Sequence, residues 1–241
     1  MPLSNQTILI TGAGGGLGSV AALTLAQQGA TIILLDKSIP KLEKIYDAII
    51  ATDAPTPIIY PFDLAGASEV QYYEMAELIK QKFTQLNGLL HSANDFNAFT
   101  PMSIHGTMAW GHTLNVNLNA PFLLTQVLLP LLQIPEHASI VFTGDSYAET
   151  AKAYAGAYGV SKIALAAYMK ILAEELSDAK KIRVNLLIPE AINSPLRKKA
   201  FPAEDKSVLP NMESLAPAYR YLFSSQSIGI TGQTLNATTL I

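Results

Sequence analysis

The chain of 241 residues contains no cysteine, which excludes disulfide bonds and cysteine-ligated metal sites. A basic excess is also lacking: 16 Lys and Arg stand against 19 Asp and Glu, the formal net charge is −3, and no nucleic-acid partner is expected. The four histidines show no metal-ligand spacing, so no metal is expected. The first residues lack the basic and apolar regions of a signal peptide, and the most apolar stretch, residues 121–132, is too short to cross a membrane. These absences predict a cytoplasmic protein without a membrane partner.

Hydrophobic residues make up 49% of the chain, enough for a large core, and short apolar runs alternate with longer amphipathic segments. The expected strands are residues 7–10, 30–35, 57–61, a short run at 89–90, 139–143, 183–188 and 233–236. The expected helices are residues 16–28, 41–50, 69–83, 110–132 and 156–176. Apolar strands that alternate with helices are typical of a parallel sheet covered on both faces. We therefore expect one α/β domain with a doubly wound parallel sheet of about seven strands flanked by helices.

Residues 193–225 interrupt this rhythm with several prolines and mixed polarity. In an open α/β sheet, ligands bind in the crevice at the carboxyl ends of the strands. An irregular segment after a late strand is well placed to cover that crevice. The interpretation is a single domain over residues 1–241 in which residues 193–225 form a substrate-covering insert.

A glycine-rich turn, TGAGGGLG at residues 11–18, lies between the first expected strand and the first expected helix. Glycines there let the backbone approach a pyrophosphate, and the helix N-terminus offers free N–H groups and the positive end of its dipole. The spacing is G-x-x-x-G-x-G, at Gly12, Gly16 and Gly18, and the turn has no lysine, which excludes a Walker-type loop. The turn predicts a dinucleotide site, with a plain glycine-rich connection as the alternative.

Asp36 ends the second expected strand. A carboxylate at this place binds both hydroxyls of the adenosine ribose and repels the additional phosphate of NADP, which favours NAD. Lys37 opposes this preference, since a lysine pairs with that phosphate. A helix cap or simple turn is the alternative role for Asp36.

Tyr158 and Lys162 stand four residues apart, which places both on one face of a helix. A nearby ammonium group favours the phenolate, so Lys162 is expected to lower the pKa of Tyr158 below its usual value of about 10. Such a pair serves as proton donor and acceptor in the interconversion of an alcohol and a carbonyl. Taken alone, this spacing is common on solvated helix faces.

Together, these motifs make the chain resemble the single-domain short-chain dehydrogenase/reductase family, and a bacterial subgroup of oxidoreductases within it, from Thr11 to about Asn236. The resemblance implies a Rossmann-like fold, hydride transfer with NAD or, less readily, NADP, and a homodimer or homotetramer. It assigns Tyr158 and Lys162 as the catalytic pair and Asn117 as the residue that anchors a relay water. The residues that it implies for cofactor binding are Gly12, Gly16, Leu17, Gly18, Asp36, Asp63, Leu64, Ala93, Lys162, Ile192 and Ser194.

The sequence departs from the family pattern at three places. His91-Ser92-Ala93-Asn94 replaces Asn-Asn-Ala-Gly after the fourth strand, and Pro189-Glu190 replaces Pro-Gly after the sixth. The catalytic serine should stand thirteen residues before Tyr158, yet that position is Asp145. An ionised Asp145 has no proton to donate to a substrate oxygen. A desolvated, protonated Asp145, or the neighbouring Ser146, would restore a donor.

The leading hypothesis is an NAD-dependent oxidoreductase that acts on a small alcohol or carbonyl compound. Tyr158 would be its general acid and base, and Asp145 or Ser146 would polarise the substrate oxygen. Two alternatives remain: a non-catalytic NAD(H)-binding protein with a regulatory or scaffolding role, and a homo-oligomeric interaction module without a ligand. Nucleotide binding and turnover distinguish the three.

Overall fold

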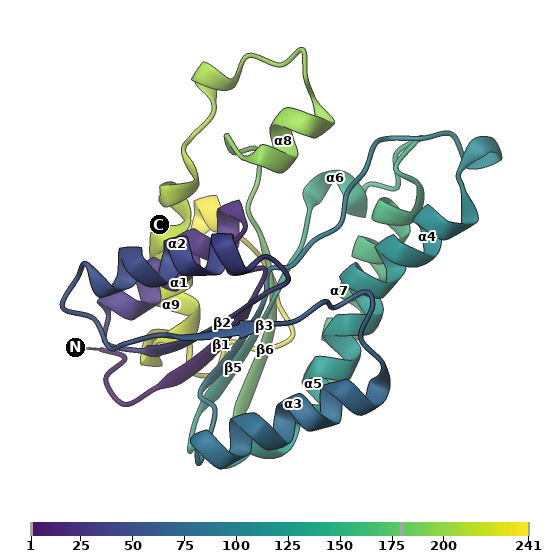
Figure 1. The fold of residues 1–241 in the computed structure, drawn as a ribbon. Coiled ribbons are helices and arrows are strands. Elements are labelled where there is room, and N and C mark those ends of the chain that lie inside the picture. The colour runs from purple at the N-terminus through teal and green to yellow at the C-terminus, as the bar shows by residue number, and fades with distance from the viewer. Residues whose placement is uncertain (1, 179–180, 241) are drawn as a thin grey trace.

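The computed structural model describes residues 2–178 and 181–240 (Figure 1). In this part of the chain, seven parallel strands form one sheet in the order β3-β2-β1-β4-β5-β6-β7. The strands are β1 (Thr7–Thr11), β2 (Thr31–Asp36), β3 (Ile58–Pro61), β4 (Gly88–His91), β5 (Ala138–Thr143), β6 (Ile182–Ile188) and β7 (Thr234–Asn236). The chain reverses direction across the sheet between β1 and β4, which is where ligands bind in doubly wound folds. The expected Rossmann-like α/β fold is confirmed.

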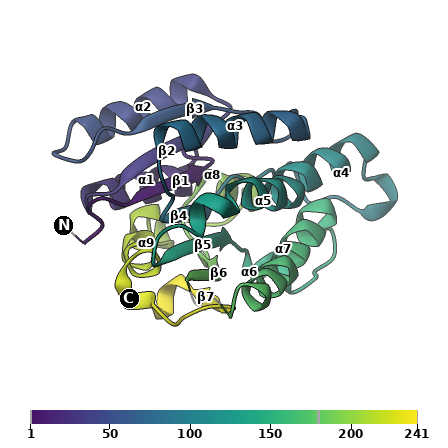
Figure 2. The same cartoon turned by 90° about the horizontal axis from the view of Figure 1, so that it is seen from below.

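Helices cover the sheet on both faces, as Figure 2 shows from one end. One face carries α1 (Gly16–Gln27), α2 (Ile39–Ile50) and α9 (Ala216–Phe223), and the other carries α3 (Glu69–Lys82), α5 (Ala120–Leu132) and α7 (Gly156–Glu175). Each layer has its own core. Leu25, Leu42 and Leu222 belong to the first core, and Tyr72 and Met169 to the second. The strands are therefore buried on both sides, which explains their unbroken apolar runs.

The long helix expected at 110–132 begins earlier and contains an irregularity. Helix α4 (Thr107–Leu114) continues through a π-helical turn, η2 (Asn115–Asn119), into α5. By length and composition alone, the stretch from Thr107 to Leu132 resembles a membrane-crossing helix. Leu124 and Leu128 are fully buried in the core against the sheet, so this apolar content is that of a core helix.

The region after β6 divides into two parts. Helix α8 (Pro195–Ala200) stands beyond the carboxyl ends of the strands, whereas α9 packs beside α1 and belongs to the helical layer (Figure 1). Tyr219 and Leu222 of α9 are fully buried. A further short helix, α6 (Ser146–Glu149), follows β5.

Candidate active site

A cavity of about 370 Å³ opens at the carboxyl ends of the strands. It extends from the glycine-rich turn after β1 to the first turns of α7 and to α8. The residues predicted from the sequence that line it are Gly12, Gly16, Leu17, Gly18, Asp36, Asp63, Leu64, Ala93, Asp145, Ser146, Tyr158, Lys162, Ile192 and Ser194. The fold thus brings together motifs that are spread over more than 180 residues of sequence.

The glycine-rich turn is shaped by close backbone contacts. Gly12 has a φ of +64°, and a Cβ added there would lie 2.7 Å from the Cα of Ala93. The hydroxyl of Thr11 accepts hydrogen bonds from the N–H groups of Ser92 and Ala93, each at 3.1 Å, and holds the ends of β1 and β4 together. Helix α1 begins at Gly16, and its first turn borders the cavity. This is the arrangement that binds the phosphates of a dinucleotide.

Asp36 lies at the rim of the same end of the cavity. One carboxylate oxygen accepts the N–H of Gly14 at 3.2 Å, and the other accepts the N–H of Ser38 at 3.0 Å. These bonds hold the carboxylate beside the glycine-rich turn. Lys37 and Lys41 line the cavity next to it, so charges of both signs are present there.

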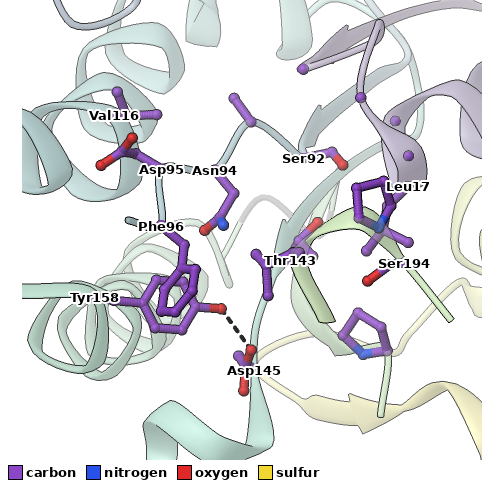
Figure 3. A pocket seen from close by; sticks show the side chains of 18 of the residues that line it. Leu17, Ser92, Asn94, Asp95, Phe96, Val116, Thr143, Asp145, Tyr158 and Ser194 are labelled. Carbon is purple, nitrogen blue, oxygen red and sulfur yellow. Dashed lines mark hydrogen bonds between the residues drawn. The ribbon is translucent and has the colours of Figure 1, made fainter. Parts of the chain in front are cut away.

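At the other end of the cavity, Asp145 rather than Ser146 contacts the tyrosine hydroxyl (Figure 3). The hydroxyl of Tyr158 donates to Oδ2 of Asp145 at 2.6 Å, and the N–H of Tyr147 donates to Oδ1 at 2.8 Å. Burial, followed by the charge of Asp145 and its hydrogen bond, raises the pKa of Tyr158 well above its usual value. The expected lowering by Lys162 is therefore wrong for the described structure, because a nearer carboxylate and desolvation act in the opposite direction.

Lys162 is buried one helical turn after Tyr158. Its ammonium group donates to the carbonyl oxygen of Thr143 at 2.9 Å and lies 5.8 Å from the centre of the Tyr158 ring. Burial lowers the pKa of Lys162 to about 8, and the charge of Asp145 opposes this shift.

Asn117 does not line the cavity, although it is predicted as a site residue. It is buried in the π-helical turn, where its Oδ1 accepts the N–H of Asp95 at 2.7 Å. Its Nδ2 donates to the carbonyl of Asp95 at 2.9 Å and to the hydroxyl of Ser161 at 3.1 Å. The amide thus ties the segment after β4 to α7. π-helical turns recur at functional sites, and this one sets the position of Asn117.

The segment after β6 contains the second departure from the family pattern. Glu190 stands where the pattern has glycine, and it adopts a φ of +62°, a conformation that strains a residue with a Cβ. Ser194 accepts the N–H of Arg197 at 3.1 Å and thereby caps α8. Both residues line the cavity.

An aromatic wall that the sequence did not reveal borders Tyr158. It consists of Phe96, Phe99, Tyr147 and Phe201, all of which line the cavity. Arg197 stacks over Phe201, with its guanidinium carbon 3.9 Å from the ring centre, and is held by two hydrogen bonds to Glu204 at 2.6 and 2.8 Å. The rings come from three separate segments without a common spacing, so no sequence signal joined them.

His91, the first departure, is structural. Its side chain is buried, stacks on Phe142 with ring centres 4.7 Å apart, and shares a hydrogen bond of 3.0 Å with Thr125. Burial lowers the pKa of His91 to about 3. A neutral imidazole under the end of β4 supports the neighbouring turn rather than reacting.

Several buried polar atoms of the cavity have no hydrogen-bond partner among the described residues. They are the hydroxyls of Ser92 and Thr143 and the amide oxygen of Asn94. Such groups cost free energy unless a ligand or water satisfies them. Together with the turn at Gly12, which leaves no room for a Cβ, they fit a nucleotide cofactor.

Comparisons with known proteins agree with this geometry. The family model for short-chain dehydrogenases matches residues 6–205. The uncharacterized oxidoreductase YciK of Escherichia coli K12 is 35% identical over 98% of this chain and 92% of its own. The chain belongs to the short-chain dehydrogenase family.

Two solved structures are similar over nearly the whole chain. A short-chain dehydrogenase from Shigella flexneri 2a, complexed with NADP, has a TM-score of 0.95 and 34% identity, and 98% of both chains is covered. One from Pseudomonas syringae has a TM-score of 0.95 and 38% identity, with 98% of this chain and 96% of that chain covered. The chain is thus a member of a family of oxidoreductases that use a nucleotide cofactor.

Proposed function

We propose that the protein transfers a hydride between NAD(H) and a small alcohol or carbonyl compound. The observation that carries the proposal is the position of Tyr158 and Lys162, which face a cavity that the glycine-rich turn borders at its other end. Both ends belong to one continuous pocket, as a nicotinamide dinucleotide requires. The bound cofactor supplies or accepts the hydride.

Tyr158 holds the proton that the reaction moves. Its raised pKa keeps the hydroxyl protonated near neutral pH, which suits donation to a carbonyl oxygen during reduction. Lys162 orients the ribose and carries a positive charge close to the Tyr158 ring. Asn117 is a positioning residue for the relay, because its amide fixes Asp95 and Ser161 rather than touching the cavity.

For the cofactor, we propose NAD over NADP on the strength of Asp36. Its carboxylate lies where the adenosine ribose binds in this fold and would repel a phosphate there. Lys37 and Lys41 line the same end, and the Shigella flexneri relative is complexed with NADP, which makes NADP the alternative. We propose that the other predicted cofactor residues also contact the cofactor, with Asp63 and Leu64 at its adenine end.

The cover of the substrate end is proposed to be the first part of residues 193–225. Leu196, Arg197 and Phe201 line the cavity from α8 and the residue after it. We propose that residues 1–241 form a single domain. The cytoplasmic location stays a prediction.

We further propose a homodimer or homotetramer built on α5 and α7. Their outer surfaces expose apolar side chains, namely Phe122, Val160, Ile163 and Ile171. Exposed apolar patches of this kind mark association surfaces. Light scattering at micromolar concentration tests the proposal, and a monomer would contradict it.

A second candidate function, non-catalytic cofactor binding, is favoured by the Asp145 carboxylate that already accepts the Tyr158 hydroxyl. NADH oxidation is measured against aldehydes, ketones and quinones with the wild type and with Asp145→Ser. Turnover by the wild type supports the oxidoreductase. An inert wild type, with activity gained in Asp145→Ser, supports the binding protein. An active wild type that Asp145→Ser leaves unchanged would make Ser146 the donor, which Ser146→Ala then tests.

A further inference from the structure

The substrate end of the cavity combines a carboxylate with the aromatic wall. Phe96 packs edge-on against Tyr158, with ring centres 5.1 Å apart. The ring centres of Phe99 and Tyr147 are 4.7 Å apart. Asp145 lines the same cavity and is hydrogen-bonded to Tyr158 (Figure 3). Aromatic faces and carboxylates both attract cations.

Asp145 acts as an acceptor in both of its hydrogen bonds described above. Its two partners, the Tyr158 hydroxyl and the Tyr147 N–H, each bring a donor to a carboxylate oxygen, as the N–H of a bound cation would. A carbonyl oxygen gains negative charge as hydride arrives and would meet a like charge. A protonated C=N group brings a positive charge and an N–H donor to the same place.

Three cations of this region are bound to other groups, although Lys162 keeps its positive charge beside Asp145. Lys162 donates to the carbonyl of Thr143, Lys199 donates to the carbonyl of Phe96 at 2.9 Å, and Arg197 is neutralised by Glu204. Glu190 adds a second acid to the cavity lining. Among the residues that line this end, Asp145 and Glu190 stand against Lys162, since Arg197 is paired with Glu204, and this excess of acids suits a cationic substrate.

We propose that this site reduces the C=N bond of an apolar or aromatic iminium compound in preference to a C=O bond. The inference rests on the proposed hydride transfer and names its substrate class. The iminium carbon receives the hydride of NADH and forms a C–H bond, the π electron pair of the C=N bond becomes the nitrogen lone pair, and NADH is oxidised to NAD⁺. Asp145 accepts the N–H of the iminium and keeps the nitrogen protonated until the hydride is transferred. The neutral amine takes a proton from solvent and leaves as an ammonium ion.

The test compares 3,4-dihydroisoquinoline with 1-tetralone, two bicyclic compounds of similar shape that differ in the reducible bond. Oxidation of NADH and of NADPH is followed for the wild type, Asp145→Asn and Asp145→Ser. Glu77→Gln is the charge-matched control, because Glu77 is an exposed acid on α3 that pairs only at the surface with Lys80.

The wild type should reduce the imine at least about tenfold more efficiently than the ketone, the value of one hydrogen bond to a charged group. Asp145→Asn should remove that preference, Asp145→Ser should shift it toward 1-tetralone, and Glu77→Gln should leave it unchanged. A wild type that prefers the ketone, or an unchanged ratio in Asp145→Asn, overturns the inference while the proposed oxidoreductase stands. If NADH binds but neither compound nor any carbonyl compound is reduced, the proposed function fails and the inference fails with it.

Discussion

The two ends of the cavity are built by different means. At the end bordered by the glycine-rich turn, the proposed nucleotide end, the backbone is closely packed: Gly12 lies against Ala93, and the first turn of α1 borders the cavity. At the substrate end, the wall is made of side chains, with the aromatic wall around Asp145 and Tyr158. The first end depends on glycines, which have no side chain, and the second depends on particular side chains. Small additions should therefore damage the first end, whereas exchanges of chemistry should act on the second.

The largest effect is expected at the substrate end. Tyr158→Phe removes the proton that carbonyl reduction moves, and turnover of a carbonyl substrate should fall by about 10²- to 10⁴-fold, the usual contribution of a general acid or base. NADH affinity should stay nearly unchanged, because the ring is retained. NADH oxidation and a fluorescence titration measure the two quantities. Equal losses in both would show that Tyr158 serves binding rather than chemistry.

At the nucleotide end, Gly12→Ala should destabilise the fold by about 1–3 kcal/mol and weaken NADH binding. The added Cβ would lie 2.7 Å from the Ala93 backbone at a residue with a φ of +64°. Thermal unfolding and titration provide the readouts. Gly111→Ala in α4 is the control, since a Cβ there meets no atom within 4 Å in the described structure, and it should not destabilise the protein.

Between the two ends, His91 should make stability depend on pH. Its folded pKa, about 3, lies below the usual 6.5, so the unfolded chain binds the proton first as the pH falls. Stability is complete above pH 6.5 and declines toward pH 3, with a loss of about 1.5 kcal/mol between pH 6.5 and 5. In urea unfolding across this range, the free energy of unfolding should change less with pH for His91→Asn than for the wild type. His137→Asn, at an exposed histidine, should keep the wild-type dependence of the free energy of unfolding on pH.

A smaller change is expected from Asp36→Ala. Removing the carboxylate should weaken NADH binding about tenfold, or 1.4 kcal/mol, and narrow the difference between NADH and NADPH. Lys37→Ala should weaken the binding of NADPH and leave the binding of NADH unchanged. Fluorescence titration with both cofactors measures this, and an NADPH preference in the wild type would show that the lysines outweigh Asp36.

The smallest effect concerns the strained residue beside the substrate end. Glu190→Gly should raise the free energy of unfolding by up to about 1 kcal/mol, because glycine adopts a φ of +62° without strain. Glu190→Ala keeps the strain and should bring no gain. Chemical denaturation compares the two variants, and equal stability would place the strain elsewhere.

Much of the fold could be predicted because its signals are local. Apolar runs predicted each strand to within one residue at either end, and the glycine-rich turn and Asp36 indicated the proposed nucleotide end. Errors arose where the environment mattered. The helix expected to start at 110 starts at Thr107, and α9 proved to belong to the helical layer beside α1 rather than to the cover.

By itself, the sequence determined the strand–helix alternation, the glycine-rich turn and the four-residue spacing of Tyr158 and Lys162, since each follows from local composition and backbone periodicity. Only the tertiary structure decided that Asp145 rather than Ser146 reaches the Tyr158 hydroxyl, that Asn117 stands behind the cavity, and that the aromatic wall surrounds the site. Those outcomes depend on which side chains meet from distant segments and on how far burial changes their charge. Neither is encoded in any short stretch of the chain.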